Sequence, residues 1–128
     1  MQYPEKQFEK ELERACAFLG FYYCKIPDAQ GITARNRAKN RELKRPFDAV
    51  LIVPNGIYCV ECKINSGKLS EHQKANEKRI NEINGSFLIF RKRISKTSNS
   101  TYACYKNNVK IIESDSIIDF LKKIVDIS

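Results

Sequence analysis

The segment RPFDAVLIVPNGIYCVECK, residues 45–63, limits the possible folds more than any other part of the chain. Two apolar runs stand on either side of an Asn-Gly pair, which is a strong signal for a tight turn between antiparallel strands. The segment therefore predicts a β-hairpin with strands over residues 47–53 and 57–63. Three charged side chains interrupt this buried pattern at its open end, and they need an explanation.

Helix and strand patterns continue on both sides of the hairpin. Apolar residues recur at helical spacing up to Gly20, where a helix is expected to end. The last helix is expected to have Ser114 as its N-cap. The expected elements are a helix over 4–19, a strand over 21–26, a helix over 70–84, strands over 86–91, 101–105 and 109–112, and a helix over 114–127.

These elements predict an α/β fold with a central mixed β-sheet flanked by helices. The strand 86–91 is expected to lie parallel to the strand 57–63, because a helix connects them. The length of 128 residues fits a single domain spanning 1–128.

Composition narrows the class of protein and of partner. A hydrophobic content of 42% with 30% charged residues is typical of a globular protein. The sequence has no membrane-length apolar run and no signal-peptide pattern, so we expect an intracellular, cytoplasmic protein without a membrane partner. Five cysteines, an odd number, fit reduced thiols. The net charge of +8 favours a polyanionic partner such as nucleic acid.

The charged residues of the hairpin are predicted to meet at one end of the sheet. Glu61 and Lys63 project to the same face because strand side chains alternate, and the antiparallel hairpin brings Asp48 within reach of them. Buried carboxylates are costly unless they pair with a cation or bind a metal ion. Mg²⁺ suits such a pair, and the backbone carbonyl of Cys62 is a further candidate ligand. A salt-bridge cluster at the surface is the alternative.

At these residues the chain resembles a known group of enzymes. FDAVLIVPNGIYCVECK resembles the core of the PD-(D/E)xK nuclease superfamily, and ECKINSGKLSEHQ resembles most closely the virus-type replication-repair nuclease (VRR-NUC) group. The stretch EKELERACAFLGF, residues 9–21, is similar to the opening of archaeal Holliday-junction resolvases. The resemblance extends over residues 5–91.

The resemblance implies a restriction-endonuclease-like fold and a set of site residues. Asp48 and Glu61 are implied as ligands of Mg²⁺, for which Mn²⁺ would substitute, and Lys63 as a catalytic residue. A further acid is implied on the first helix, where Glu9 matches best and Glu5 is the reserve. One departure is that Pro46 stands two residues before the aspartate and not directly before it.

Gln73 has two interpretations that the sequence leaves open. In the resembling nucleases a glutamine at this place supports the active site. Ser70 and Gln73 also have the spacing of a capping box, which explains the glutamine without catalysis. For His72, the only histidine, a solvated position in the first helical turn is favoured over a role as general base.

Cys59 and Cys62 form a Cys-x-x-Cys pair that does not predict a zinc site. Residues three apart on a strand face opposite sides, so the two sulfur atoms diverge. The sequence offers no second pair with ligand spacing, and both cysteines are interpreted as packing residues.

A basic segment directly precedes Asp48 and is predicted to bind phosphates. Six such contacts would give a slope of log K against log salt of roughly −5. Residues 91–96, RKRISK, are expected to form a second basic rim, and nothing resembles a base-reading module. The candidate nucleic-acid-binding residues are Arg35, Arg37, Lys39, Arg41, Lys44, Arg45 and Lys68.

The sequence thus predicts a Mg²⁺-dependent, structure-specific DNA endonuclease that hydrolyses phosphodiester bonds in branched DNA, in Holliday junctions or flaps. We expect a homodimer, because a small domain needs two active sites to cut two strands, and no small-molecule cofactor. The alternatives are a nicking or restriction-type nuclease, a non-catalytic nucleic-acid-binding protein of the same fold, and a basic structural protein.

Overall fold

A computed structural model of the chain describes residues 4–27, 45–97 and 99–127. The order of its elements is the one that the sequence predicts, with α1 at residues Pro4–Leu19 as expected. The other elements are β1 (Tyr22–Lys25), β2 (Ala49–Val53), β3 (Gly56–Ile64), α3 (Glu71–Glu82), β4 (Phe87–Arg93), β5 (Thr101–Lys106), β6 (Val109–Ser114) and α4 (Ile117–Val125).

In the described part of the chain, six strands form one mixed sheet in the order β1-β2-β3-β4-β5-β6. The predicted hairpin is confirmed as the antiparallel pair of β2 and β3, in which Val53 pairs with Gly56 around the turn. β3 and β4 pair in parallel, which confirms the prediction made from the helix that connects them. The remaining neighbours are antiparallel.

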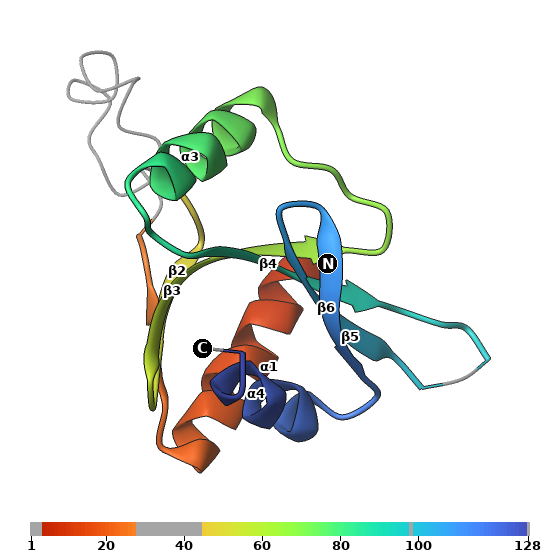
Figure 1. The fold of residues 1–128 in the computed structure, drawn as a ribbon. Coiled ribbons are helices and arrows are strands. Elements are labelled where there is room, and N and C mark those ends of the chain that lie inside the picture. The colour runs from red at the N-terminus through yellow and green to blue at the C-terminus, as the bar shows by residue number, and fades with distance from the viewer. Residues whose placement is uncertain (1–3, 28–44, 98, 128) are drawn as a thin grey trace.

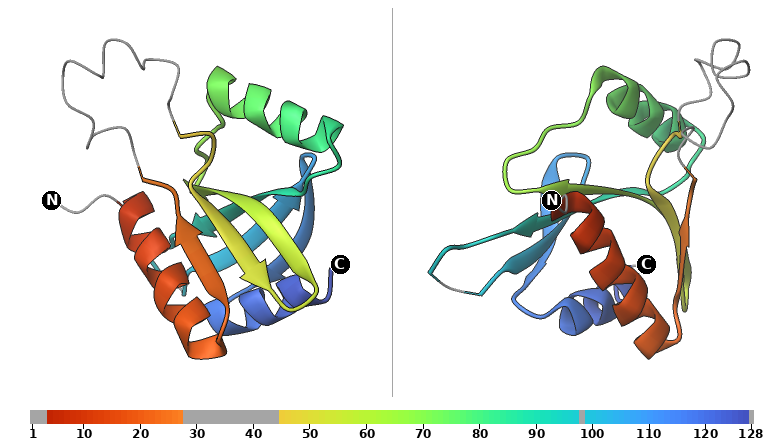
Figure 2. Two further views of the ribbon diagram at one scale, coloured as in Figure 1. Left: turned by 90° about the vertical axis from the view of Figure 1, so that its left-hand side faces the viewer. Right: turned by 180° about the vertical axis from the view of Figure 1, so that it is seen from behind.

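The helices lie on both sides of this curved sheet (Figure 1). α1 and α4 pack together against one face, and α3 lies on the other side, above the end of the sheet where β2 begins (Figures 1 and 2). This arrangement confirms the predicted α/β fold with a central mixed sheet flanked by helices. Within the described ranges, no helix combines the length and the apolar character that a membrane span requires.

The hydrophobic core fills the space between α1, α4 and the sheet. Phe8 and Leu12 contribute from one stripe of α1, and Phe120 of α4 meets Phe90 of β4 edge to face, with ring centroids 5.0 Å apart. Burying side chains of this size stabilises the fold by about 1.5–3 kcal/mol each. α3 contains no buried residue, so its position is not explained by the core.

The expected N-cap of the last helix is wrong by two residues. Ser114 is the last residue of β6, and Ser116 caps α4 by accepting a hydrogen bond from the backbone N–H of Asp119 at 3.3 Å. Strand β6 extends further than the apolar pattern indicated, so the helix starts later.

All five cysteines are free thiols, as predicted. Cys62 is buried in the core while Cys59, three residues earlier on β3, lies half-buried on the opposite face. This arrangement confirms the prediction that the two side chains lie on opposite faces of the strand.

Candidate active site

Asp48 occupies the position at which β2 separates from β3. Its backbone N–H donates to the carbonyl of Val60 at 3.0 Å. The backbone hydrogen bonds between β2 and β3 end here. The next N–H of β3 that faces β2, that of Cys62, donates to Oδ2 of the Asp48 carboxylate at 2.7 Å. Oδ1 pairs with the guanidinium of Arg45 at 2.7 Å. The side chain of Asp48 is therefore buried and held at both oxygens, in a fixed place at the end of the sheet.

Glu61 lies beside Asp48 and is only 2% exposed. Gln73 of α3 donates from Nε2 to its Oε1 at 2.9 Å. Burial raises the pKa of the Glu61 carboxyl to about 9, and the neighbouring charge of Asp48 adds to the effect, while the charge of Lys63 opposes it. The structure thus brings Asp48, Glu61 and Lys63 together at one end of the hairpin, where the alternation of side chains predicted them.

Glu9 approaches the same place from α1 and is 4% exposed. The hydroxyl of Tyr23 donates to its Oε1 at 3.1 Å, and the ammonium group of Lys25 lies 3.7 Å from its Oε2. Burial raises the pKa of Glu9, and the charge of Asp48 raises it further. Glu5, one turn earlier, is exposed at the surface, although desolvation by the nearby protein raises its pKa too. Glu9 is therefore the acid of α1 that lies within the cluster.

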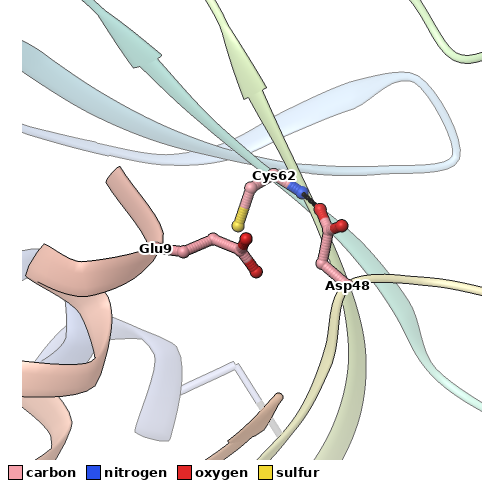
Figure 3. A group of neighbouring side chains, drawn as sticks. All are labelled: Glu9, Asp48 and Cys62. Atoms are coloured by element: carbon pink, nitrogen blue, oxygen red, sulfur yellow. Dashed lines mark hydrogen bonds between the residues drawn. The ribbon is translucent and has the colours of Figure 1, made fainter. Parts of the chain in front are cut away.

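One group of three metal-binding donors forms within the described residues: Glu9, Asp48 and Cys62 (Figure 3). The two carboxylate oxygens and the thiol sulfur all lie within 4.8 Å of one another. The thiol of Cys62 belongs to this group, on the face that meets α1. The backbone carbonyl of Cys62 stays a predicted ligand. Glu61 is outside this group of three because alternation along β3 directs it to the α3 side, so Asp48 is the residue that the two sides share.

The cluster fits a hard divalent cation. Three buried carboxyl groups converge, and burial, together with the charge of Asp48, raises the pKa values of two of them, Glu9 and Glu61. Mg²⁺ and Mn²⁺ prefer oxygen ligands, and one or two carboxylates suffice for Mg²⁺. Burial raises the pKa of the Cys62 thiol well above its ordinary value, so the sulfur is neutral and the carboxylates are the suitable ligands.

Gln73 completes the predicted capping box and also contacts Glu61, while its support of catalysis stays a prediction. Its Oε1 accepts from the backbone N–H of Ser70 at 2.8 Å, and its own N–H donates to the Ser70 hydroxyl at 3.1 Å, which completes the capping box of α3. Its Nε2 holds Glu61. His72 is exposed, and its Nε2 lies 3.3 Å from the amide of Asn76, so it remains outside the carboxylate cluster.

The basic residues predicted to bind phosphates are only partly described by the structure. Arg45 pairs with Asp48 and donates to the carbonyl of Ile26 at 3.3 Å, so its guanidinium belongs to the carboxylate cluster. Lys68 is exposed in the turn after β3. The remaining candidates, which are Arg35, Arg37, Lys39, Arg41 and Lys44, lie outside the described residues.

Sequence reasoning missed the residues that hold Glu9. The sequence patterns assigned no role to Tyr23 or Lys25. Both lie on β1 two positions apart, so both face α1. A tyrosine and a lysine on the helix-facing side of an otherwise apolar strand are the signal that could have identified them as partners of a buried acid.

A comparison with solved structures identifies a similar fold. Hjc, a Holliday junction resolvase from the archaeal hyperthermophile Archaeoglobus fulgidus, matches with a TM-score of 0.50 and 13% sequence identity. The match covers 91% of this chain and 98% of that chain. No protein-family model and no curated protein matches the chain. The chain therefore has a restriction-endonuclease-like α/β fold, and its resemblance to the VRR-NUC group stays a prediction.

Proposed function

We propose that the protein is a metal-dependent nuclease that hydrolyses phosphodiester bonds in branched DNA. The observation that carries this proposal is the convergence of Asp48, Glu61 and Lys63 at one end of the sheet, with Glu9 completing the acidic cluster. The likeness to a Holliday junction resolvase supports it at the level of the fold. The net charge of +8 suits a nucleic-acid substrate.

Asp48, with Glu61 and Glu9 on either side, would hold a Mg²⁺ or Mn²⁺ ion. The ion, when bound, supplies positive charge that favours ionisation of water and offsets the negative charge of a phosphate. The backbone carbonyl of Cys62 is a further candidate ligand. The neutral Cys62 thiol and the core behind it exclude water from the α1 side.

The protein's own groups position the reacting atoms. Arg45 and the N–H of Cys62 fix the orientation of Asp48, and Gln73 fixes that of Glu61. Lys63 is close enough to Glu61 to affect its ionisation, which supports a role in which its ammonium group would orient water and stabilise charge developing on the phosphate. Fixed partners of this kind reduce the reorganisation that the reaction would otherwise require.

The proposal extends to the partner and the assembly. We infer that the DNA is branched, a junction or a flap, because nothing in the chain resembles a module that reads bases. Cutting both strands of a branch point requires two active sites, so we propose a homodimer. The second candidate function is a nucleic-acid-binding protein that keeps the fold without catalysis.

A cleavage panel tests the proposal. The wild-type protein is incubated with a four-way junction, a flap, duplex and single-stranded DNA, each with Mg²⁺, with Mn²⁺ and with EDTA. We expect cutting of a branched substrate only when the metal is present. Asp48→Asn and Lys63→Ala should each reduce the rate about 100-fold or more, while binding measured in EDTA stays within a fewfold. Wild-type protein that binds these DNAs and cuts none would favour the binding protein.

A further inference from the structure

A cationic groove lies beside the proposed active site, on the same face of the sheet as Glu61. The turn after β3 forms one wall, and the ends of β4 and β5 form the other. Six residues that line it are Ser66, Lys68, Arg91, Arg93, Tyr105 and Asn108. Among the described residues that line this groove, none is acidic. Glu113, which interacts electrostatically with Arg93, forms an ion pair with Lys110 at 2.6 Å.

The turn that carries Lys68 is fixed to β4 by several hydrogen bonds. The backbone N–H of Asn65 donates to the carbonyl of Lys92 at 2.9 Å, and its side-chain oxygen accepts from the N–H of Ile94 at 2.8 Å. Arg91 donates to the carbonyls of Asn65 and Gly67 at 2.6 and 2.8 Å. The wall is therefore organised before any ligand binds, and Arg91 acts as a positioning residue.

The groove combines exposed cations with an aromatic ring. Lys68 and Arg93 are exposed. Tyr105 is half-buried, with the Arg91 guanidinium 5.6 Å from its ring centroid. A change of register between β5 and β6 falls next to this tyrosine, and such irregularities often redirect a side chain. Basic residues along a groove with an aromatic platform are typical of proteins that bind single-stranded nucleic acid, whose bases are free to stack.

The strand register connects this groove to the active site. Glu61 of β3 pairs with Ile89 of β4, which pairs with Tyr105 of β5, and Lys63 pairs with Arg91 in the next row. Neighbouring strands are about 4.8 Å apart, so Tyr105 lies about 10 Å from Glu61 across the sheet. A DNA strand that leaves the carboxylates can therefore reach the tyrosine within a few nucleotides.

We propose that this groove binds a single-stranded DNA arm that continues from the cut site, with phosphates on Lys68 and Arg93 and a base on Tyr105. The position of the cut rests on the proposed function, whereas binding by the groove does not. The preferred substrate is then a flap or another branch with an unpaired arm, since bases inside a duplex cannot reach the tyrosine.

Binding measured in EDTA tests the groove without cleavage. The double variant K68E/R93E is compared with the control K10E/K122E, which makes the same change of net charge on the opposite side of the sheet, on exposed residues of α1 and α4. We expect the groove variant to bind a single-stranded oligonucleotide at least tenfold more weakly than the control. Its slope of log K against log salt should become shallower by about 1.4, the value for two lost phosphate contacts.

The tyrosine separates stacking from charge. Tyr105→Ala should weaken single-strand binding about tenfold, while Tyr105→Phe retains the ring and should retain the affinity. Thermal melting of each variant checks that it folds. Equal binding by the groove variant and its control, or wild-type protein that binds a blunt duplex as tightly as a single strand, would overturn the inference and leave the proposed nuclease intact. Conversely, if the groove variant loses single-strand binding while the wild-type protein cuts none of the DNAs, the groove is supported and the proposed nuclease is overturned.

Discussion

Asp48 and Glu61 illustrate what two neighbouring carboxyl groups require when both are buried. Asp48 pairs with the charged guanidinium of Arg45 and accepts from a backbone N–H, whereas Glu61 accepts a neutral hydrogen bond from Gln73 and lies beside the charge of Asp48. Burial and the charge of Asp48 therefore raise the pKa of Glu61 from its ordinary value of 4.5 to about 9. Since a nearby cation would reverse this balance, protonation of Glu61 and metal binding should compete.

The first prediction concerns the stability of the metal-free protein. Between pH 4.5 and about 9 the folded state keeps the Glu61 proton, while the unfolded chain has lost it. The free energy of unfolding should therefore be highest below this window and fall as the pH rises, by up to about 1.4 kcal/mol per pH unit. Glu61→Gln removes this titration, so the variant should show a shallower fall in urea denaturation measured from pH 5 to 9.

Glu71→Gln is the matched control, since it makes the same chemical change at an exposed glutamate. Its pH dependence should follow the wild type. Adding Mg²⁺ at pH 8 should raise the melting temperature of the wild type more than that of Glu61→Gln, because a ligand stabilises only the state that binds it. Wild-type and Glu61→Gln curves that run parallel across the window would contradict the proposed state of this residue.

At the scale of the element, α3 is held by the site and not by the core. It buries no residue, and its hydrogen bonds to the rest of the fold include those from Gln73 to Glu61 and from Asn76 to the carbonyl of Pro46. Its capping box sets the first turn, and the same glutamine that closes this box reaches the carboxyl group. The start of the helix and the orientation of Glu61 are therefore one structural feature.

The second prediction separates the two roles of Gln73. Gln73→Glu preserves the capping-box chemistry but places a carboxylate against Glu61, so activity should fall about 10–100-fold with little loss of helix stability. Ser70→Ala removes a cap and should cost about 1 kcal/mol of stability, with the rate of cleavage nearly unchanged. Thermal melting and cleavage rates of both variants check this. Equal loss of activity in the two would show that the glutamine acts through the helix alone.

The elements that could be predicted from sequence are those determined by local patterns. The stripe Phe8, Leu12, Ala15, Cys16 and the stop at Gly20, whose φ is +78°, gave α1 its bounds. The turn at Asn55, with a φ of 73°, fixed the register that brings Asp48 to Glu61.

Local patterns could not predict the contacts that depend on how separate elements pack against one another. The sequence offered both Glu9 and Glu5 as the acid of α1, and the packing of α1 against β1 buries Glu9 beneath Tyr23. The same packing turns the Cys62 thiol toward Glu9. The pairing of Arg45 with Asp48 depends likewise on the path of the chain before β2, which has no periodic pattern.

At the scale of the whole molecule, the two faces of the sheet differ in the residues that they present. The face toward α1 and α4 holds the core, and the face toward α3 presents Glu61, Lys63 and the cationic groove. Asp48 stands at the end of the sheet where the two meet. A substrate that follows the groove would therefore reach the carboxylates from the α3 side, and the basic residues 35–44 precede the site in the chain.

The third prediction assigns the long-range attraction for DNA to this basic segment. Arg45 is left intact, because it holds Asp48 at 2.7 Å and its loss would disturb the site itself. Reversing the charge of Arg35, Arg37, Lys39, Arg41 and Lys44 should weaken duplex binding strongly and make the slope of log K against log salt shallower by up to about 4.5, since each phosphate contact contributes about 0.9.

The matched control is Arg45→Gln, which should behave in the opposite way. Because Arg45 compensates Asp48, its loss should reduce metal-dependent cleavage while the salt slope changes by less than about one contact. Fluorescence anisotropy in EDTA across a range of salt concentrations measures the slopes, and initial rates with Mg²⁺ measure the cleavage. An unchanged salt slope in the variant with five reversed charges would exclude residues 35–44 as phosphate-binding residues. The groove beside Lys68 would then be the principal contact with DNA.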